Sequence, residues 1–242
     1  MSLQELTERL IMMVDQDPKY HLKPGYRMEV YRTFGWPLVR GYNEQRRAYC
    51  RSGHLARITA QQVYPIWERQ IPHLLAQDPT ADVYTPYRLL IASEAFVNTL
   101  DPRVKSQLET LTHRTHDWLG AMAYDIPLQA FSAAHAILNA ANTILRPHLL
   151  ELISQETFVA HLTDDDLDVL ALDYAGAAMK AYTTLDPEKP AMEPSEPVAM
   201  AYFQQQQAFW TAMEMVSFQR RREFWTWWLS TAVPAAWEAA QS

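Results

Sequence analysis

The chain has 242 residues, 48% of them hydrophobic, so it can bury a sizeable core in one large domain. Its 21 Lys and Arg against 28 Asp and Glu give a formal charge of −7, which disfavours binding to nucleic acid or anionic lipid because both need clustered positive charge. The single cysteine cannot form an internal disulfide, and residues 1–20 carry too many charges for a signal peptide. We therefore expect a cytoplasmic protein with no nucleic-acid or membrane partner.

The composition predicts an all-α fold. Only 6 glycines stand against 15 prolines, whereas sandwiches and Rossmann sheets need frequent glycine turns. We expect a single domain over residues 1–242 with about eight helices. The first helix should cover 3–15. The prolines and glycines of 16–45 predict a long irregular segment with only short helical turns.

The helix expected at 46–70 should be kinked or divided, because Pro65 and Pro72 each remove a backbone donor and clash with the preceding turn. Two more helices should follow, one from Pro86 to Asp101 and one across 103–120.

The alanine-rich stretch 127–146 has the strongest helical pattern and is predicted to be the central helix. Another helix should cover 148–160, and Thr163 is a good N-cap for a helix over 164–184. Four prolines in twelve residues then predict an extended connector at 185–198.

The C-terminal part, 199–237, is predicted to form aromatic helices at 199–217 and 219–232, the second ending at Pro234. Four of the eight tryptophans fall in the last eighteen residues of the chain. So much aromatic surface must dock on a core or on a partner. Trp225 and Trp228, three residues apart, should share a buried face.

Two sets of polar residues could carry metal chemistry. Asp164, Asp165 and Asp168 belong to a DDxxD pattern, which in isoprenoid enzymes holds Mg²⁺ against a diphosphate. Capping of a helix start is the favoured interpretation, because acidic residues suit a first turn and no facing acidic cluster is evident.

His116 and Asp117, with His113, could belong to a phosphohydrolase metal site completed by His73 and Asp173. A solvated helix face is the favoured interpretation of this set, since a chain with 8 histidines and 28 acidic residues produces such sets by chance.

Three further features have a functional and a structural interpretation. His135 could be a ligand or a hydrogen-bonded core histidine, and Cys50, near Arg47 and Arg51, could be a reactive thiol or a small structural residue. The run 220–222 of three arginines could stack on nucleic acid, or cover an aromatic face and pair with acidic neighbours. The structural interpretation is favoured in each case.

A resemblance to a known family lies in residues 62–68, Gln-Val-Tyr-Pro-Ile-Trp-Glu, followed by Pro72 and Asp78-Pro79. These are similar to the L-P-x-[WF]-E motif and proline-rich step of the bacterial immunity protein family called Imm5. The alanine-rich 131–141 and the basic-then-aromatic 222–234 resemble later parts of that family, so the resemblance covers 45–240.

This resemblance implies an all-α, non-enzymatic protein, made beside a polymorphic toxin, that binds the toxin and protects the producing cell. It implies no catalytic residue, metal or cofactor. The acidic balance suits a basic toxin domain. The alternatives are a metal-dependent hydrolase or isoprenoid-type enzyme using the residues above, and a structural or ligand-binding helical protein.

The segment 26–44 is the best candidate for a partner-binding surface, because it is rich in the aromatic and arginine side chains that dominate binding energy. We take Tyr31, Arg32, Trp36 and Arg40 as candidate contact residues. The alternative, favoured by the cost of ordering a long free loop, is that these aromatics pin the segment onto the core.

Overall fold

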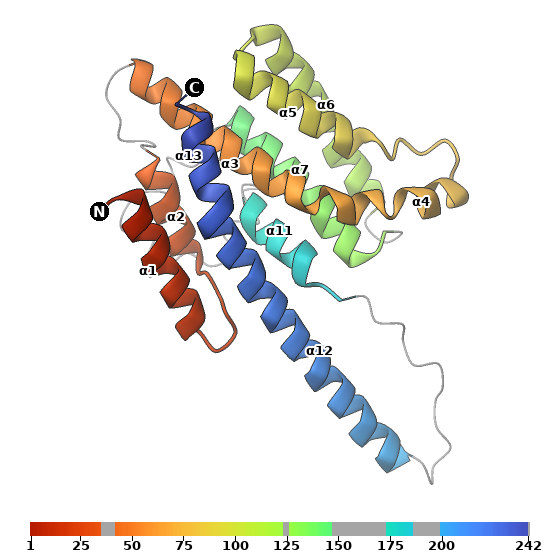
Figure 1. Ribbon diagram of the computed structural model, residues 1–242. Coiled ribbons are helices and arrows are strands. Elements are labelled where there is room, and N and C mark those ends of the chain that lie inside the picture. Colours follow the sequence, from red (N-terminus) through yellow and green to blue (C-terminus); the bar gives the residue numbers. More distant parts are fainter. Residues whose placement is uncertain (35–41, 123–125, 147–172, 186–198, 242) are drawn as a thin grey trace.

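The computed structural model describes residues 1–34, 42–122, 126–146, 173–185 and 199–241, with the backbone alone for 199–210 (Figure 1). Every regular element in those ranges is a helix, so the predicted all-α domain is confirmed. Within the same ranges no helix is long and apolar enough to cross a membrane. The expected helix at 148–160, the start of the one at 164–184 and most of the connector at 185–198 lie outside the described residues.

The N-terminal helices are α1 (Leu3–Gln16) and α2 (Pro24–Thr33). A capping box starts α1: Ser2 Oγ accepts from the Glu5 N–H, and Glu5 accepts from the Ser2 N–H in return. The prediction of an irregular segment at 16–45 is wrong where α2 forms. Pro24 lies in the first turn of α2, where its missing N–H breaks no intrahelical bond, so it starts this helix.

Helix α3 (Tyr42–Glu68) is followed by α4 (Ile71–Gln77), which confirms the predicted division. The break falls at 69–70. Pro65 lies inside α3, whereas Pro72 lies in the first turn of α4.

The centre of the molecule is α7 (Leu128–Leu145), in which thirteen of eighteen residues are buried. Helices α3 and α11 (Tyr174–Thr183) contact it, as do α5 (Thr85–Thr99) and α6 (Pro102–Ala121). The many alanines of α7 let these neighbours approach closely, as the sequence predicted. Helix α5 also lies close to α3, since a Cβ at Gly53 would lie 2.7 Å from a methyl of Val97.

The C-terminal part is one continuous helical path and not two helices separated near 218. It consists of α12 (Ala199–Trp227), a π-helical turn (Trp228–Ala232) and α13 (Val233–Ala239). The expected end at Pro234 is also wrong, because this proline lies in the first turn of α13, where its missing N–H is tolerated. The π-helical turn, which is wider than an α-helical turn, connects α12 directly to α13.

Docking of the tail on the core is confirmed. Trp225 and Trp228 are both 0% exposed, and their ring centroids lie 5.8 Å apart in an edge-to-face arrangement. The indole N–H of Trp228 donates to Oγ1 of Thr59 in α3 at 2.9 Å. The C-terminal path therefore completes the core.

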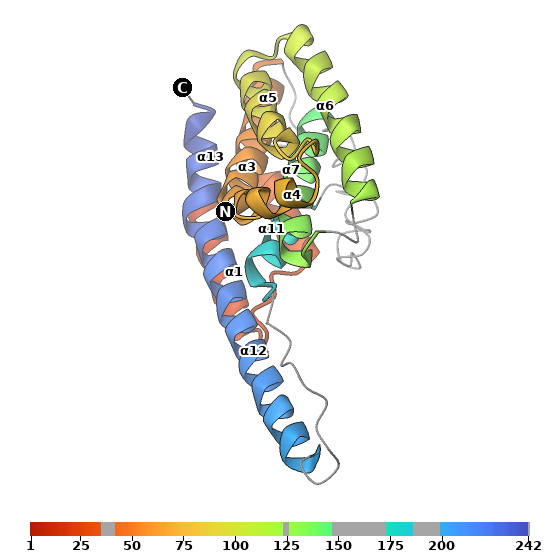
Figure 2. The same ribbon diagram turned by 90° about the vertical axis from the view of Figure 1, so that its right-hand side faces the viewer.

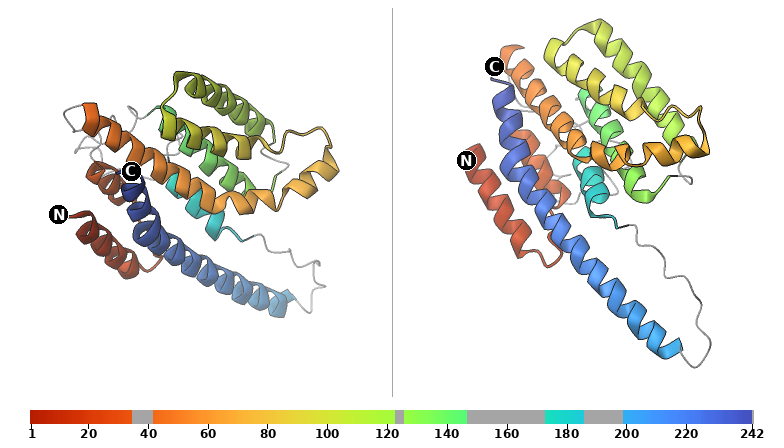
Figure 3. Two further views of the ribbon diagram at one scale, coloured as in Figure 1. Left: turned by 45° about the horizontal axis from the view of Figure 1, so that its top comes forward. Right: turned by 45° about the vertical axis from the view of Figure 1, so that its right-hand side comes forward.

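Helix α12 belongs to an outer layer and projects beyond the body. Figure 2 shows α12 and α13 along one edge of the molecule and α6 along the opposite edge, and Figure 3 shows the first half of α12 reaching past the other described helices. The 29 residues of α12 span about 43 Å. Helices α1 and α11 contact it.

A buried ion pair connects α2 to the start of α11. Nη2 of Arg27 donates to Oδ2 of Asp173 at 2.9 Å, and both side chains are 2% exposed. Asp173 also caps α11, since its Oδ1 accepts from the Gly176 N–H at 2.9 Å. A Cβ at Gly176 would lie 1.9 Å from Oδ2, so this position needs glycine.

Candidate functional site

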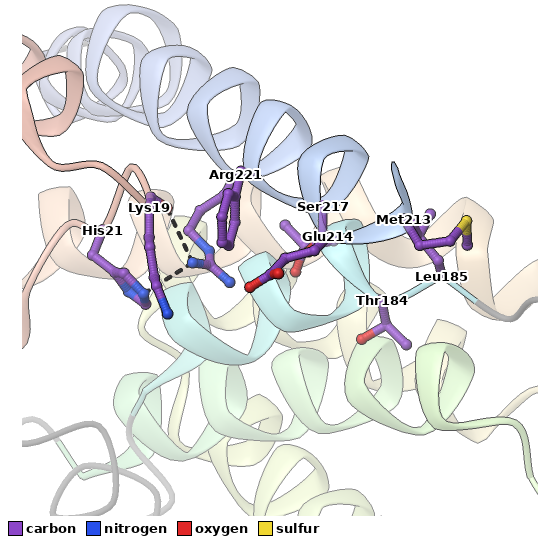
Figure 4. Close-up of a pocket in the computed structure, with 10 residues that line it drawn as sticks. Lys19, His21, Thr184, Leu185, Met213, Glu214, Ser217 and Arg221 are labelled. Carbon is purple, nitrogen blue, oxygen red and sulfur yellow. Dashed lines mark hydrogen bonds between the residues drawn. The ribbon is translucent and has the colours of Figure 1, made fainter. Parts of the chain in front are cut away.

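The basal groove is the open depression beside α12 where this helix leaves the body, and its volume is about 430 Å³. Three segments that are distant in the sequence line it: the loop after α1, the end of α11 and the middle of α12 (Figure 4). Its lining residues are Lys19, His21, Thr183, Thr184, Leu185, Met213, Glu214, Ser217, Phe218 and Arg221.

The loop that carries Lys19 and His21 is held by Asp17. Oδ1 of Asp17 accepts from the Lys19 N–H at 2.8 Å and from the His21 N–H at 3.2 Å. Partial burial acts to raise the pKa of this carboxyl, but the two N–H donors and the nearby positive charges outweigh it and keep the pKa below its usual value. The carboxylate therefore stays ionised and fixes the loop at neutral pH.

Arg221 ties this loop to α12. Its Nη1 donates to the Lys19 carbonyl at 3.0 Å and contacts Nε2 of His21 at 2.9 Å. Because a guanidinium has no acceptor, Nε2 of His21 must carry the lone pair in this contact. Arg221 and Lys19 also lie over the Phe218 ring, at 5.5 Å and 5.9 Å from its centroid.

The two ends of the groove differ in chemistry. Figure 4 shows Lys19, His21 and Arg221 gathered at one end and Met213 and Leu185 at the other, with Glu214 between them. The groove therefore presents positive, negative and apolar side chains within one open depression.

The expected contact residues at 26–44 have different outcomes. Tyr31 is 4% exposed and packs on Tyr174 and Trp228, with ring centroids 5.8 Å and 6.4 Å away. The prediction of a surface contact is wrong for Tyr31, because this ring fills the core. Arg32 is half-buried. Trp36 and Arg40 lie outside the described residues.

The residues of the alternative metal sites form no group of three or more where the structure describes them. The side chains of His116 and Asp117 are 71% and 85% exposed on α6, as the solvated-face interpretation predicted. His73 is exposed on α4, and Asp173 is engaged by Arg27 in the core.

Asp164, Asp165 and Asp168 lie outside the described residues. Among the residues that the structure does describe, no group of three or more His, Cys, Asp or Glu side chains could hold a metal ion.

The structural interpretation is confirmed for two of the arginines, and the surroundings of Cys50 agree with it. Burial raises the pKa of the Cys50 thiol, against the weaker effect of nearby Arg46, so a reactive thiolate is disfavoured. Arg222 pairs with Asp15 at 2.7 Å and lies over a tyrosine ring, while Arg221 holds the loop described above. His135 is half-buried, with its ring 4.5 Å from that of Phe131.

The sequence prediction missed the basal groove, because its residues come from three segments with no common motif. The single available signal was the arginine run beside the aromatic tail.

A scan against protein-family models found no match, and searches of curated proteins and of solved structures found no similar chain. The resemblance to the Imm5 family therefore stays a prediction.

Proposed function

We propose that this chain binds another protein, and that the partner is a bacterial toxin which the chain neutralises as an immunity protein in the cytoplasm of the producing cell. The basal groove carries this proposal. At the base of a projecting helix it joins Arg221, Met213 and Phe218, whose residue types are enriched in protein interfaces, and it adds the charges of Lys19 and Glu214.

A basic toxin domain is the partner that suits the charges best. The chain carries a formal charge of −7, so it attracts a basic partner over several ångströms of solvent. Glu214 is exposed and lines the groove, where it offers a carboxylate to a lysine or arginine of the partner. Met213 and Phe218 beside it supply apolar contact area.

The experiment measures binding between the purified chain and a catalytically inactive form of the toxin encoded by the neighbouring gene. Glu214→Lys should weaken this binding about thirtyfold, equivalent to ~2 kcal/mol, since it places a cation opposite a basic partner. Glu109→Lys on α6 is the matched control. This glutamate is half exposed, so the same charge change there should alter the dissociation constant less than about twofold.

The proposal is wrong if the neighbouring gene encodes no toxin, or if its product does not bind. Equal losses for both lysine variants would mean that net charge, and not the groove, governs binding. Titration with Mg²⁺ or Mn²⁺ tests the enzyme alternatives, since a real metal site should bind near stoichiometrically and raise the melting temperature.

A further inference from the structure

The outer face of α12 is the strip that points away from the body. Phe224 and Trp225 lie on the inner side, because each is at most 1% exposed, and Trp228 and Leu229 of the π turn continue that side with 0% exposure. On the opposite side Met215 is 62% exposed and Val216 is 44% exposed. Ala212 and Gln219, one turn before and after, are exposed as well. Figure 2 shows the first half of α12 extending past the other described helices.

The outer face continues into a second groove, between α12 and α1, with a volume of about 460 Å³. Ile11 and Asp15 of α1 form one side of it. Residues of α12 and of the π turn form the other: Gln219, Arg222, Glu223, Thr226, Trp227, Ser230 and Thr231. An exposed helix face thus leads into an open depression beside α1.

We propose that this face binds a second copy of the chain, with the two α12 helices antiparallel and Met215 at the two-fold axis. Met215 lies midway between Ala199, where α12 begins, and Thr231, at the far end of the second groove. In this register, the first turns of one α12 reach the groove beside α1 of the other copy.

The side chains at the centre favour an identical partner. A two-fold axis brings each residue on it next to its own copy, so a charge there would meet a like charge. Ala212, Met215, Val216 and Gln219 carry none. Over the whole stretch 198–219 the sequence contains one charged residue, Glu214, which lines the basal groove instead.

The available area is sufficient for a dimer of moderate affinity. Residues 199–231 span about 50 Å, and a helix is about 10–12 Å wide. Full overlap would therefore cover about 500–600 Å² of each chain, or about 1,000–1,200 Å² in total, which is near the lower limit for specific interfaces. We expect a dissociation constant of about 10 μM.

The antiparallel arrangement also separates like charges. Each chain carries −7, and each body is attached to the C-terminal half of its own α12. Antiparallel overlap places the two bodies at opposite ends of the helix pair. The repulsion across that distance is screened at physiological salt, where the Debye length is about 8 Å.

Sedimentation velocity on the chain alone tests this proposal, so the outcome does not depend on any toxin. The wild-type chain should be mostly dimeric at about 100 μM and mostly monomeric at about 1 μM. Met215→Glu and Met215→Lys should each be monomeric at about 100 μM, because each places two like charges at the axis. An equimolar mixture of the two variants should dimerise again, since the axis then joins opposite charges.

Leu128→Glu is the control, because Leu128 is 66% exposed on α7, away from this face. This variant should dimerise like the wild-type chain. A wild-type chain that stays monomeric at about 100 μM would overturn the proposal. So would a Met215→Glu chain that still dimerises, or a mixture of the two Met215 variants that does not.

Discussion

The buried pair of Arg27 and Asp173 allows a sharp test of the core. Asp173→Asn keeps an oxygen that can cap α11 at the Gly176 N–H but removes the negative charge. Arg27 would then remain 2% exposed, with the Leu22 carbonyl at 2.8 Å still accepting from Nη1. A carbonyl dipole does not balance a full charge in a medium of low dielectric constant.

Removal of one partner of a buried ion pair costs about 3–5 kcal/mol, and a whole domain is stable by only about 5–15 kcal/mol. We therefore expect Asp173→Asn to lose about 3 kcal/mol of unfolding free energy. At a urea slope of about 2–3 kcal/mol per M, the midpoint should fall by about 1 M or more. The assay is urea unfolding followed by circular dichroism at neutral pH.

Asp101→Asn is the matched control. Asp101 also caps a helix, since its Oδ1 accepts from the Arg103 N–H at 2.7 Å, but Asp101 is exposed. Asparagine caps about as well as aspartate, so this variant should lose less than about 0.5 kcal/mol. A loss below about 1 kcal/mol for Asp173→Asn would refute the assignment of this ion pair as a stabilising element of the core.

Three further outcomes are expected. Gly176→Ala should unfold at a clearly lower temperature in calorimetry, because its Cβ would meet Asp173. Gly120→Ala should be neutral or stabilising, because its Cβ would meet nothing within 4 Å beyond its chain neighbours and the backbone of its own helix. Trp228→Phe leaves the Thr59 hydroxyl without its indole donor and should cost about 1–3 kcal/mol in denaturant unfolding; a loss below about 0.5 kcal/mol would contradict this. Burial raises the pKa of Tyr49. Burial raises the pKa of Tyr31 and Tyr174 in the same way. The folded state therefore keeps these protons above pH ~10 while the unfolded chain releases them. The unfolding free energy should fall by up to ~1.4 kcal/mol per pH unit for each of the three tyrosines between pH 10 and 11, as denaturant unfolding at both pH values can measure.

The sequence predicted the centre of the fold because one helix carries an unambiguous pattern. The alanines and leucines of 127–146 favour helix and leave room for neighbours, and α7 forms there. The tryptophans at 225 and 228 were equally informative, since large apolar rings at helical spacing have to be buried.

The errors in the predicted helix boundaries arise at prolines, because a proline can either end a helix or lie in the first turn of one. From sequence, Pro24 and Pro234 predict a break in the helix, yet each lies in the first turn of a helix, where the locked φ angle fits and no hydrogen bond is lost. Pro65 lies inside α3 without ending it. Local sequence alone does not distinguish these positions, because tertiary packing decides whether the flanking residues stay helical.

The candidate site was less predictable than the fold. Tyr31 has the residue type of a binding anchor, but the same ring is as suitable for a core, and packing against Tyr174 determined its place. Lys19, Glu214 and Arg221 meet only because α12 passes the loop after α1 and the end of α11. Periodicity shows which face of a helix is apolar but not which distant segment will lie beside it.

The contact between α1 and the C-terminal path affects how the chain folds during synthesis. Asp15 of α1 pairs with Arg222, which lies 207 residues later. At about 5–20 residues per second, a ribosome needs about 10–40 s to produce that partner. Leu6 and Leu10, both fully buried in the finished protein, lack part of their cover in that interval. Helix α1 is thus made long before α12 but is completed only when α12 has formed, and the nascent chain exposes an apolar surface to which chaperones can bind.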